Sequence, residues 1–440
     1  MVAVEVAFLV VAAIIIIGYI GMLLFKKTKV SDILILMAVG LILGPVSSYL
    51  GPNGTGMLPF ELLGQSELAL FQGFLPFFAA FALIIILFEG GLHLNFFKVI
   101  KSFGESFAFT IIVFFLSIAF VILVLWAGSN FGLLKFDLLV SLMIGAIIGG
   151  TSSAIVIPLV NSTKAGEETK TLLSLESALT DALCVIVAVA AAEIILLNSF
   201  NVSQVGTSLL GAFTIAAFLG LIAGLVWLRL LSLLRDKPYE YLMTLGVLLL
   251  LYTITVFFGG NGAIAALTFG LVLGNSEDIT RMLRLTPRSI DWRIKSFQAE
   301  VSFLVRTFFF VYLGLLFKFE FFTPGMIAVS LAIMFLFLLA RRIGAVILKK
   351  FKPVFAQDQK LITTMAARGL AAAVLISLPT SMGLNLDSSV LNMITTIVFL
   401  IICFSNIVAT IGVFLSEKER AKKEKSEDKK PQEIKIEERN

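Results

Sequence analysis

The sequence is dominated by long apolar runs, each about as long as an α-helix that crosses the hydrocarbon layer of a membrane. Such a helix needs about 20 apolar residues. Of the 440 residues, 59% are hydrophobic and only 14% are charged, whereas a water-soluble domain carries about 25% charged residues. These values exclude a soluble globular fold and predict an all-α polytopic membrane protein. Thirteen candidate spans are predicted, at residues 3–25, 31–50, 68–92, 105–128, 137–161, 170–197, 207–234, 239–258, 262–275, 296–317, 324–348, 360–383 and 388–415.

Basic residues are distributed unevenly among the loops between these spans. The first span is followed, not preceded, by a lysine cluster at 26–29, which is the reverse of a cleavable signal peptide. With the N-terminus outside, only Lys135 and Lys318 of the 34 lysines and arginines lie in external loops. Arg341 and Arg342, at the end of the eleventh span, are counted among the basic residues on the cytoplasmic side. This asymmetry satisfies the positive-inside rule and predicts a cytoplasmic C-terminus. The net charge of +5 therefore does not indicate nucleic-acid binding.

Two short glycine patterns recur along the chain. The sequence GLILG at 40–44 returns as GLVLG at 270–274, and Gly-Leu at 91–92 returns at 314–315. Each second copy lies seven spans after the first, and an odd shift reverses the direction across the membrane, so inverted repeats are predicted. The expected organisation is a transmembrane domain at 1–415, with repeats at about 1–197 and 239–415 and a linker helix at 207–234, followed by a disordered or loosely helical charged tail at 416–440.

The fifth and twelfth spans, also seven apart, both contain residues that interrupt a helix. One holds the run GGTSS at 149–153, and the other holds AARG at 366–369, followed by Pro379. Paired interruptions at corresponding places indicate the binding site of a transporter. Unwound backbone exposes carbonyl oxygens, and the hydroxyls of Thr151 and Ser152 add further oxygens at the same depth.

The sixth span carries a carboxylate near mid-membrane. Asp181 lies 11 residues after Lys170, about 16 Å along a helix, and Ser177 shares its face at a spacing of four. A charge at this depth in the membrane costs several kcal/mol, so a charged residue there is expected to have a partner or a function. We therefore expect Asp181 to face an aqueous cavity and to hold either a proton or a monovalent cation. The alternative is a structural carboxylate satisfied by a neighbouring helix.

Other intramembrane charges are expected to act mainly in structure. Arg368 in the twelfth span must be neutralised, and Glu176 is the expected partner in a buried core pair, with direct transport chemistry as the alternative. Glu89 lies at the cytoplasmic end of the third span. Glu300 and Arg306 are six residues apart on the tenth span, so each needs a partner elsewhere, and Arg306 is expected to be a structural or gating residue.

At these motifs the chain resembles the monovalent cation/proton antiporter superfamily, specifically the archaeal and bacterial sodium/proton antiporters related to animal sodium/proton exchangers. The resemblance covers nearly all of residues 1–415. The motifs that carry it are GLILGP (40–45), LFEGGLHLN (87–95), GGTSSAIV (149–156), ESALTDA (176–182), FFFVYLGL (308–315) and ARGLAAAVLISLP (367–379).

The resemblance implies crossed, partly unwound helices, a core domain that moves against a dimerising domain, and a homodimer in the cell membrane. By position, Asp181 is similar to the family's ion- and proton-binding aspartate. Ser177 and the carbonyl of Thr151 are similar to its Na⁺ co-ligands, and Glu176 with Arg368 is similar to its core ion pair. No cofactor is implied; the partners are monovalent cations, protons and membrane lipids.

Two positions depart from the family pattern. Thr180 stands where electroneutral members usually have Asn and electrogenic members a second Asp. Ser152 stands in place of the Asp of a Thr-Asp-Pro motif, and the following Pro is missing too. A single exchangeable carboxylate predicts electroneutral exchange of one cation for one proton. The less negative site weakens cation binding, so a K⁺/H⁺ antiporter of the same fold is the alternative to Na⁺ or Li⁺ exchange.

Two other classes of membrane protein are weighed against an antiporter. A cation channel is disfavoured because nothing resembles a potassium filter such as TVGYG. An enzyme is disfavoured because the chain has no HExxH, Gly-x-Ser-x-Gly, CxxC or phosphate-binding loop. We therefore expect a secondary transporter that is not an enzyme.

Overall fold

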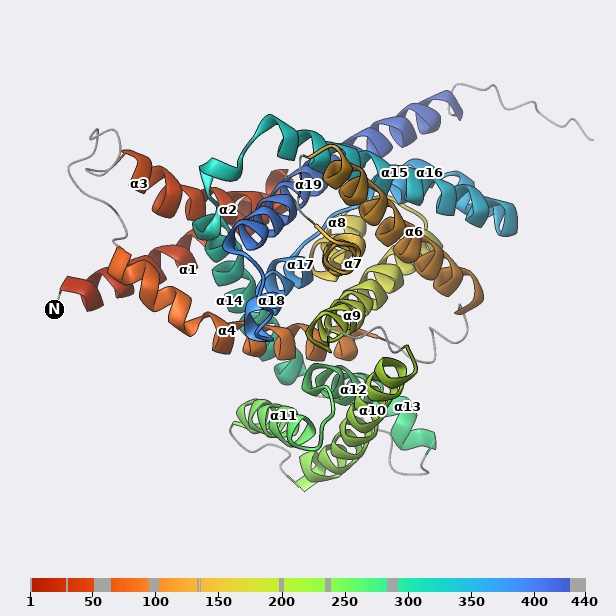
Figure 1. The fold of residues 1–440 in the computed structure, drawn as a ribbon. Coiled ribbons are helices and arrows are strands. Elements are labelled where there is room, and N and C mark those ends of the chain that lie inside the picture. The colour runs from red at the N-terminus through yellow and green to blue at the C-terminus, as the bar shows by residue number, and fades with distance from the viewer. Residues whose placement is uncertain are drawn as a thin grey trace, which may run out of the picture.

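The computed structural model describes residues 2–28, 31–50, 65–94, 103–132, 134, 136–197, 202–233, 239–282 and 292–427. The regular elements in these ranges are helices (Figure 1). Their bounds are α1 Val2–Thr28, α2 Asp32–Leu41, a π-helical turn Ile42–Val46, α3 Ser47–Leu50, α4 Gln65–His93, α6 Phe103–Asn130, α7 Leu138–Gly149, α8 Ser153–Asn161, α9 Glu167–Leu197, α10 Val202–Leu233, α11 Glu240–Phe257, α12 Gly262–Gly274, α13 Ser276–Met282, α14 Trp292–Leu316, a 3-10 turn Phe319–Phe321, α15 Pro324–Phe351, a 3-10 turn Pro353–Ala356, α16 Gln359–Thr364, α17 Leu370–Leu375, α18 Leu378–Ser381 and α19 Ser388–Glu427.

The helices confirm the expected all-α membrane architecture. Among the described residues, nine segments are long and apolar enough to cross a bilayer, and three shorter apolar helices cover the first, third and ninth predicted spans. The twelfth predicted span is the interrupted segment α16–α17. Because every predicted span coincides with helix, the apolar runs correctly located the membrane-crossing elements.

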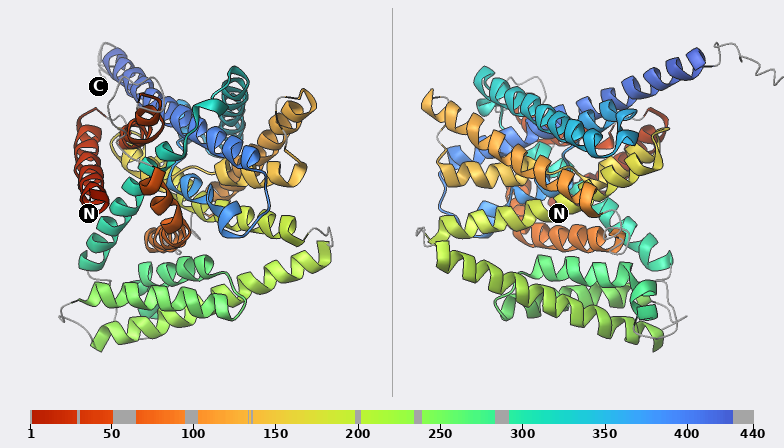
Figure 2. Two further views of the ribbon diagram at one scale, coloured as in Figure 1. Left: turned by 60° about the vertical axis from the view of Figure 1, so that its left-hand side comes forward. Right: turned by 90° about the vertical axis from the view of Figure 1, so that its right-hand side faces the viewer.

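The helices form two groups (Figures 1 and 2). In the scaffold group, α2 packs on α1 and α14, α12 packs on α4 and α10, and α11 packs on α12. In the crossing group, α7 packs on α6 and α9, and α15 packs on α6, α16 and α19. The helices α10, α11 and α12 (green) lie side by side at one edge of the molecule. The two groups meet where α4 and α14 contact α9 and α17.

Glycines bring two pairs of scaffold helices into backbone contact. A Cβ atom at Gly40 would lie 2.0 Å from the Val311 carbonyl oxygen, so α2 crosses α14 without side chains between them. A Cβ at Gly91 would lie 2.3 Å from the Leu267 oxygen, where α4 crosses α12 in the same way. The predicted repeat relates α2 to α12 and α4 to α14, and it exchanges these two crossings. The structure therefore has two inverted repeats.

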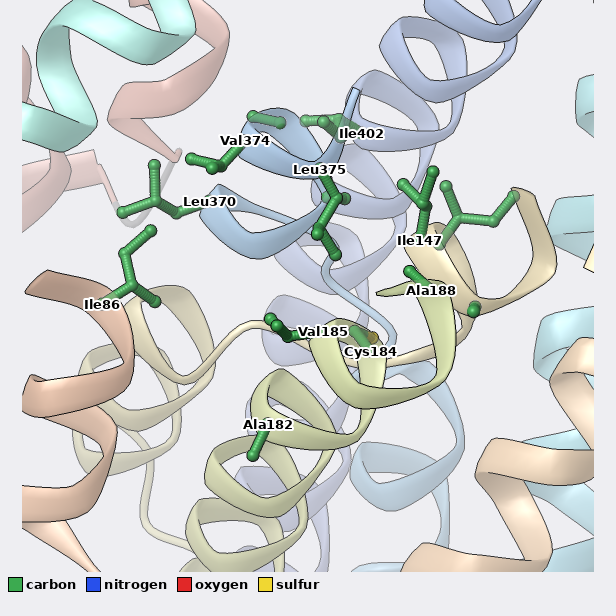
Figure 3. Close-up of a cluster of buried hydrophobic side chains, with 14 of the residues drawn as sticks. Ile86, Ile147, Ala182, Cys184, Val185, Ala188, Leu370, Val374, Leu375 and Ile402 are labelled. Carbon is green, nitrogen blue, oxygen red and sulfur yellow. The ribbon is translucent and has the colours of Figure 1, made fainter. Parts of the chain in front are cut away.

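The two interrupted helices cross at the centre of the crossing group. Between α7 and α8 the chain is extended at 150–152, and between α16 and α17 it is extended at 365–369. The Ser152 N–H donates to the Ala367 carbonyl across the crossing (2.9 Å). Both breaks were predicted. Figure 3 shows apolar side chains of α4, α7, α9, α17 and α19 gathered around this region, so its polar groups are shielded from lipid.

The beginning of the charged tail is more ordered than expected. Helix α19 continues to Glu427, and residues 428–440 lie outside the described ranges. Arg420 donates to the Lys164 carbonyl and to the Asp358 carboxylate, and Lys360 lies 3.4 Å from Glu419. The Gly166 N–H also donates to Asp358 (3.1 Å). The tail helix is thus attached to the loops beside α8 and α16.

The glycine crossings yield a stability prediction. Replacing Gly40 with Ala forces α2 away from α14, and overpacking of this kind costs about 1–3 kcal/mol. We expect a lower midpoint of thermal unfolding in detergent than for the wild type. Gly246→Ala on α11 is the matched control, because a Cβ there meets no atom within 4 Å. Equal midpoints for the two variants would contradict the close crossing.

Candidate functional site

The carboxylate of Asp181, a residue of α9, lies against Ser153, which is the first residue of α8 and so begins the second half of the α7–α8 break. One carboxylate oxygen, Oδ2, accepts hydrogen bonds from the Ser153 hydroxyl (2.6 Å) and from the Ser153 backbone N–H (3.0 Å). The Ser153 N–H is one of the backbone amides in the first turn of α8 that have no partner within the helix, and such amides carry partial positive charge. Asp181 therefore caps α8 from another helix, and its second oxygen, Oδ1, is left for other partners.

Thr151 and Thr180 hold the unwound backbone against α9. The Thr151 N–H donates to the Thr180 hydroxyl (3.1 Å), and that hydroxyl lies 3.2 Å from the Thr151 carbonyl oxygen. The Thr151 hydroxyl also donates to Glu176 Oε1 (3.2 Å). Because both threonines are buried, these contacts satisfy the peptide group that the helix break exposes.

Glu176 pairs with Arg341 of α15, so the predicted pairing of Glu176 with Arg368 is wrong. Arg341 Nη1 and Nη2 lie 2.6 and 3.0 Å from the two carboxylate oxygens, in a bidentate contact. The side chains of Arg341 and Glu176 are 0% and 1% exposed. Arg341 was assigned to cytoplasmic loop charge, but α15 continues for ten residues beyond it, to Phe351. The residue is therefore inside the protein.

Arg368 instead binds backbone oxygens at the two helix breaks. Its Nε donates to Ile148 (2.9 Å) and its Nη2 to Gly149 (3.1 Å), the last carbonyls of α7, and its Nη1 donates to Ala366 (2.6 Å). The carbonyl end of a helix carries partial negative charge. The guanidinium, stacked on the Phe337 ring at 4.1 Å, thereby neutralises the end of α7, so it does not need a carboxylate partner.

Ser177 and Ser152 are buried, and the Ser177 hydroxyl and the Ser152 N–H bond to backbone carbonyls rather than to Asp181. The Ser177 hydroxyl donates to the Ser174 carbonyl (3.1 Å), although it was expected to lie beside Asp181. Ser152 lies in the crossing, where a Cβ at Gly369 would be 2.4 Å from its hydroxyl oxygen. Gly369 therefore allows the two broken helices to approach.

The three secondary candidates, Glu89, Glu300 and Arg306, have different surroundings. Glu89 lies 4.0 Å from His93 of the same helix. Glu300 is exposed on α14. Arg306 lies 3.3 Å from Asp32 of α2, which gives it the partner expected from another element.

Three functional residues were missed by sequence reasoning: Ser153, Arg341 and Asp32. Ser153 was part of the quoted motif, but its role depends on the direction of its backbone N–H. Arg341 is followed by apolar residues at 343–348, which signal that the span continues. Asp32 stands at the start of a span, where a charged residue is usually explained by contact with water.

A buried carboxylate at the crossing of two interrupted membrane helices, within inverted repeats, defines a secondary transporter. A family model described as "Sodium/hydrogen exchanger, transmembrane" matches residues 10–415, and the chain belongs to this family. The sequence resemblance is thereby confirmed.

Known relatives of the chain include antiporters for both cations. The Na⁺/H⁺ antiporter 1 of Methanocaldococcus jannaschii is 27% identical over 356 residues, 74% of each chain. The K⁺/H⁺ antiporter NhaP2 of Shewanella sp. strain ANA-3 is 28% identical over 378 residues, which are 80% of this chain and 60% of that protein. The solved structure of the sodium proton antiporter MjNhaP1 at pH 8 superposes with a TM-score of 0.71 at 21% identity, covering 92% of this chain and 99% of that one. This likeness shows a shared fold.

The Glu176–Arg341 pair predicts a non-additive mutant cycle. Arg341→Met leaves a buried carboxylate without its partner, which costs about 3–5 kcal/mol. We expect the double variant Glu176→Leu/Arg341→Met to be more stable than Arg341→Met alone, because no buried charge is left unpaired. Thermal unfolding in detergent measures both. Arg342→Met, at the next and exposed position, is the control and should change little; additive effects would argue against the pair.

Proposed function

We propose that this protein is a secondary antiporter that exchanges a monovalent cation, Na⁺ or Li⁺, for protons, with Asp181 binding the two in competition. The observation that carries the proposal is the buried Asp181 carboxylate, whose Oδ2 is held by Ser153. A carboxylate oxygen is a ligand for a hard cation and equally a proton acceptor. Because both use one group, binding of either excludes the other. Family membership and relatives that bear antiporter names support the same activity.

The oxygens around Asp181 support a compact cation site. We propose Ser177, Thr151, Ser152 and Thr180 as its remaining members, with the Thr151 carbonyl as the backbone ligand. All four are buried, and Thr180 fixes the position of that carbonyl. Ser153 joins them through its contact with Asp181. The absence of a second carboxylate at 180 or 152 favours exchange of one cation for one proton.

Two cavities between the scaffold and crossing groups support alternating access. One, of about 410 Å³, lies against Ala154 and Ser162 of α8. The other, of about 460 Å³, lies against Val189 and Glu193 of α9, two and three turns beyond Asp181. We propose that they open to the cytoplasm and to the outside respectively, and that movement of the crossing group transfers Asp181 between them.

A K⁺/H⁺ antiporter is the second candidate. Two observations favour it. By the sequence resemblance, Ser152 stands where the family pattern has an Asp, and the NhaP2 relatives have names that state K⁺/H⁺ exchange. A cation channel is a remote third candidate, distinguished by flux that does not saturate and is not coupled to protons.

The remaining assignments extend the same proposal. We propose a homodimer in the cell membrane with the N-terminus outside and the C-terminus in the cytoplasm, working without a cofactor and without enzymatic activity. The proposed divisions are a transmembrane domain at 1–415, with repeats at about 1–197 and 239–415, a linker helix at 207–234, and the tail at 416–440. The positive-inside distribution supports the orientation.

Transport by proteoliposomes with an imposed pH gradient tests the function. We expect Na⁺ or Li⁺ to dissipate the gradient in the wild type and not in Asp181→Asn, because an amide neither binds a proton nor neutralises a cation. Asp387→Asn removes an exposed carboxylate and should retain activity. Dissipation by K⁺ alone would assign the second candidate, and full activity of Asp181→Asn would refute this site.

Competition at Asp181 also predicts how cation affinity depends on pH. As pH falls, protons occupy a larger fraction of the carboxylate, so the apparent KM for the cation should rise, approaching about tenfold per pH unit where the protonated form dominates. Initial rates at several cation concentrations and pH values measure this. A KM that does not change with pH would exclude shared binding.

A further inference from the structure

An ion pair lies in the wall of the cavity beside α8. Asp32 of α2 and Arg306 of α14 approach to 3.3 Å, and their side chains are 12% and 18% exposed. Both line the cavity of about 410 Å³, together with Ser31, Ala154 and Ser162. The pair therefore belongs to the scaffold group, while α8 of the crossing group forms the opposite wall.

This cavity leads toward the candidate cation site. Ala154 directly follows Ser153, whose hydroxyl lies 2.6 Å from Asp181. Ser162 stands at the other end of α8, two residues before Lys164, in a loop predicted to be cytoplasmic. The cavity thus extends along α8 from Ser162 to Ala154, the residue next to Ser153.

Polar side chains in an otherwise apolar lining make the cavity suitable for water: Ser31, Asp32, Ser162 and Arg306. The Ser31 hydroxyl and Arg306 Nε are buried and have no hydrogen-bond partner among the described residues. Cavities lined by such groups hold water, and a volume of this size has room for several molecules. A hydrated passage is what a cation needs to approach Asp181 without losing its hydration shell first.

We propose that the Asp32–Arg306 pair sets the charge of this passage and thereby the affinity with which cations reach Asp181 from the α8 side. An intact pair contributes almost no net charge. Without Asp32, the Arg306 guanidinium repels cations; without Arg306, the Asp32 carboxylate attracts them. The inference rests on the proposed antiport function and adds a residue pair that controls access.

The two neutralising variants are expected to change cation affinity in opposite directions. In proteoliposomes, with the cation presented on the α8 side, Asp32→Asn should raise the apparent KM about threefold to tenfold, and Arg306→Gln should lower it by a similar factor. The double variant Asp32→Asn/Arg306→Gln should return close to the wild-type KM. Raising ionic strength with choline chloride should reduce the single-variant effects.

A purely structural pair gives a different pattern. Both single variants would then lose thermal stability and maximal rate while the KM stayed unchanged, and this result would overturn the proposal. Opposite KM shifts confined to the other face of the membrane would overturn it as well. Glu168→Gln is the matched control: its carboxylate is exposed, pairs with Lys352 at 3.2 Å, and does not line this cavity.

Charges added without disturbing the pair provide a second test if the single variants do not fold. Ser162→Glu at the end of α8 should lower the cation KM, and Ser162→Lys should raise it; equal values in these two variants would overturn the proposal.

Wild-type protein assayed in parallel separates failure of the proposed function from failure of the proposed role of the passage. If it exchanges no cation for protons, the proposed function fails. If the wild type exchanges cations for protons but the cation KM is the same in all these charge variants, only the proposed role of the passage fails.

Discussion

The crossing of the two interrupted helices is the constraint on which the rest of the structure depends. Breaking a helix inside a bilayer exposes peptide groups that lipid cannot satisfy, at a cost of several kcal/mol each. Each exposed end here has a protein partner of the opposite polarity: Asp181 accepts from the start of α8, and Arg368 donates to the end of α7. The Ser152–Ala367 bond joins the two breaks. Function and fold therefore use the same groups.

The distribution of charge fits the proposal that one carboxylate at the crossing, Asp181, exchanges its partner. Glu176 is committed to Arg341 through two short bonds, and the Arg368 guanidinium is committed to carbonyl oxygens. Among the residues that the structure describes, Asp181 has hydrogen-bond donors but no directly bonded cationic side chain. Its negative charge is thus the one that a proton or a metal cation is able to balance. The glycine crossings hold the scaffold helices in close contact, which suits them to stay fixed during the proposed movement of the crossing group.

The position of the site was predictable from sequence, whereas its internal pairing was not. Helix interruptions at 149–153 and 366–369 and a carboxylate at mid-span are local features that a single sequence reveals. The partner of Glu176 depends on which way α15 is rotated and on how far a guanidinium reaches, and packing decides both. Ser153 was not predicted because a hydroxyl in a run of small residues has no evident role in the sequence. Its role becomes visible only when the fold brings it to the Asp181 carboxylate.

Helix α19 is long enough to carry the proposed movement of the crossing group beyond the membrane. Its 40 residues amount to about 60 Å, roughly twice the thickness of the hydrocarbon layer. Close to its C-terminal end, Arg420 of this helix bonds to the Lys164 carbonyl and to Asp358, in the loops beside α8 and α16. A rigid rod held in this way works as a lever. A small rotation at the ion site becomes a larger sweep of the tail, so that a molecule gripping the tail is positioned to sense or to oppose each transport cycle.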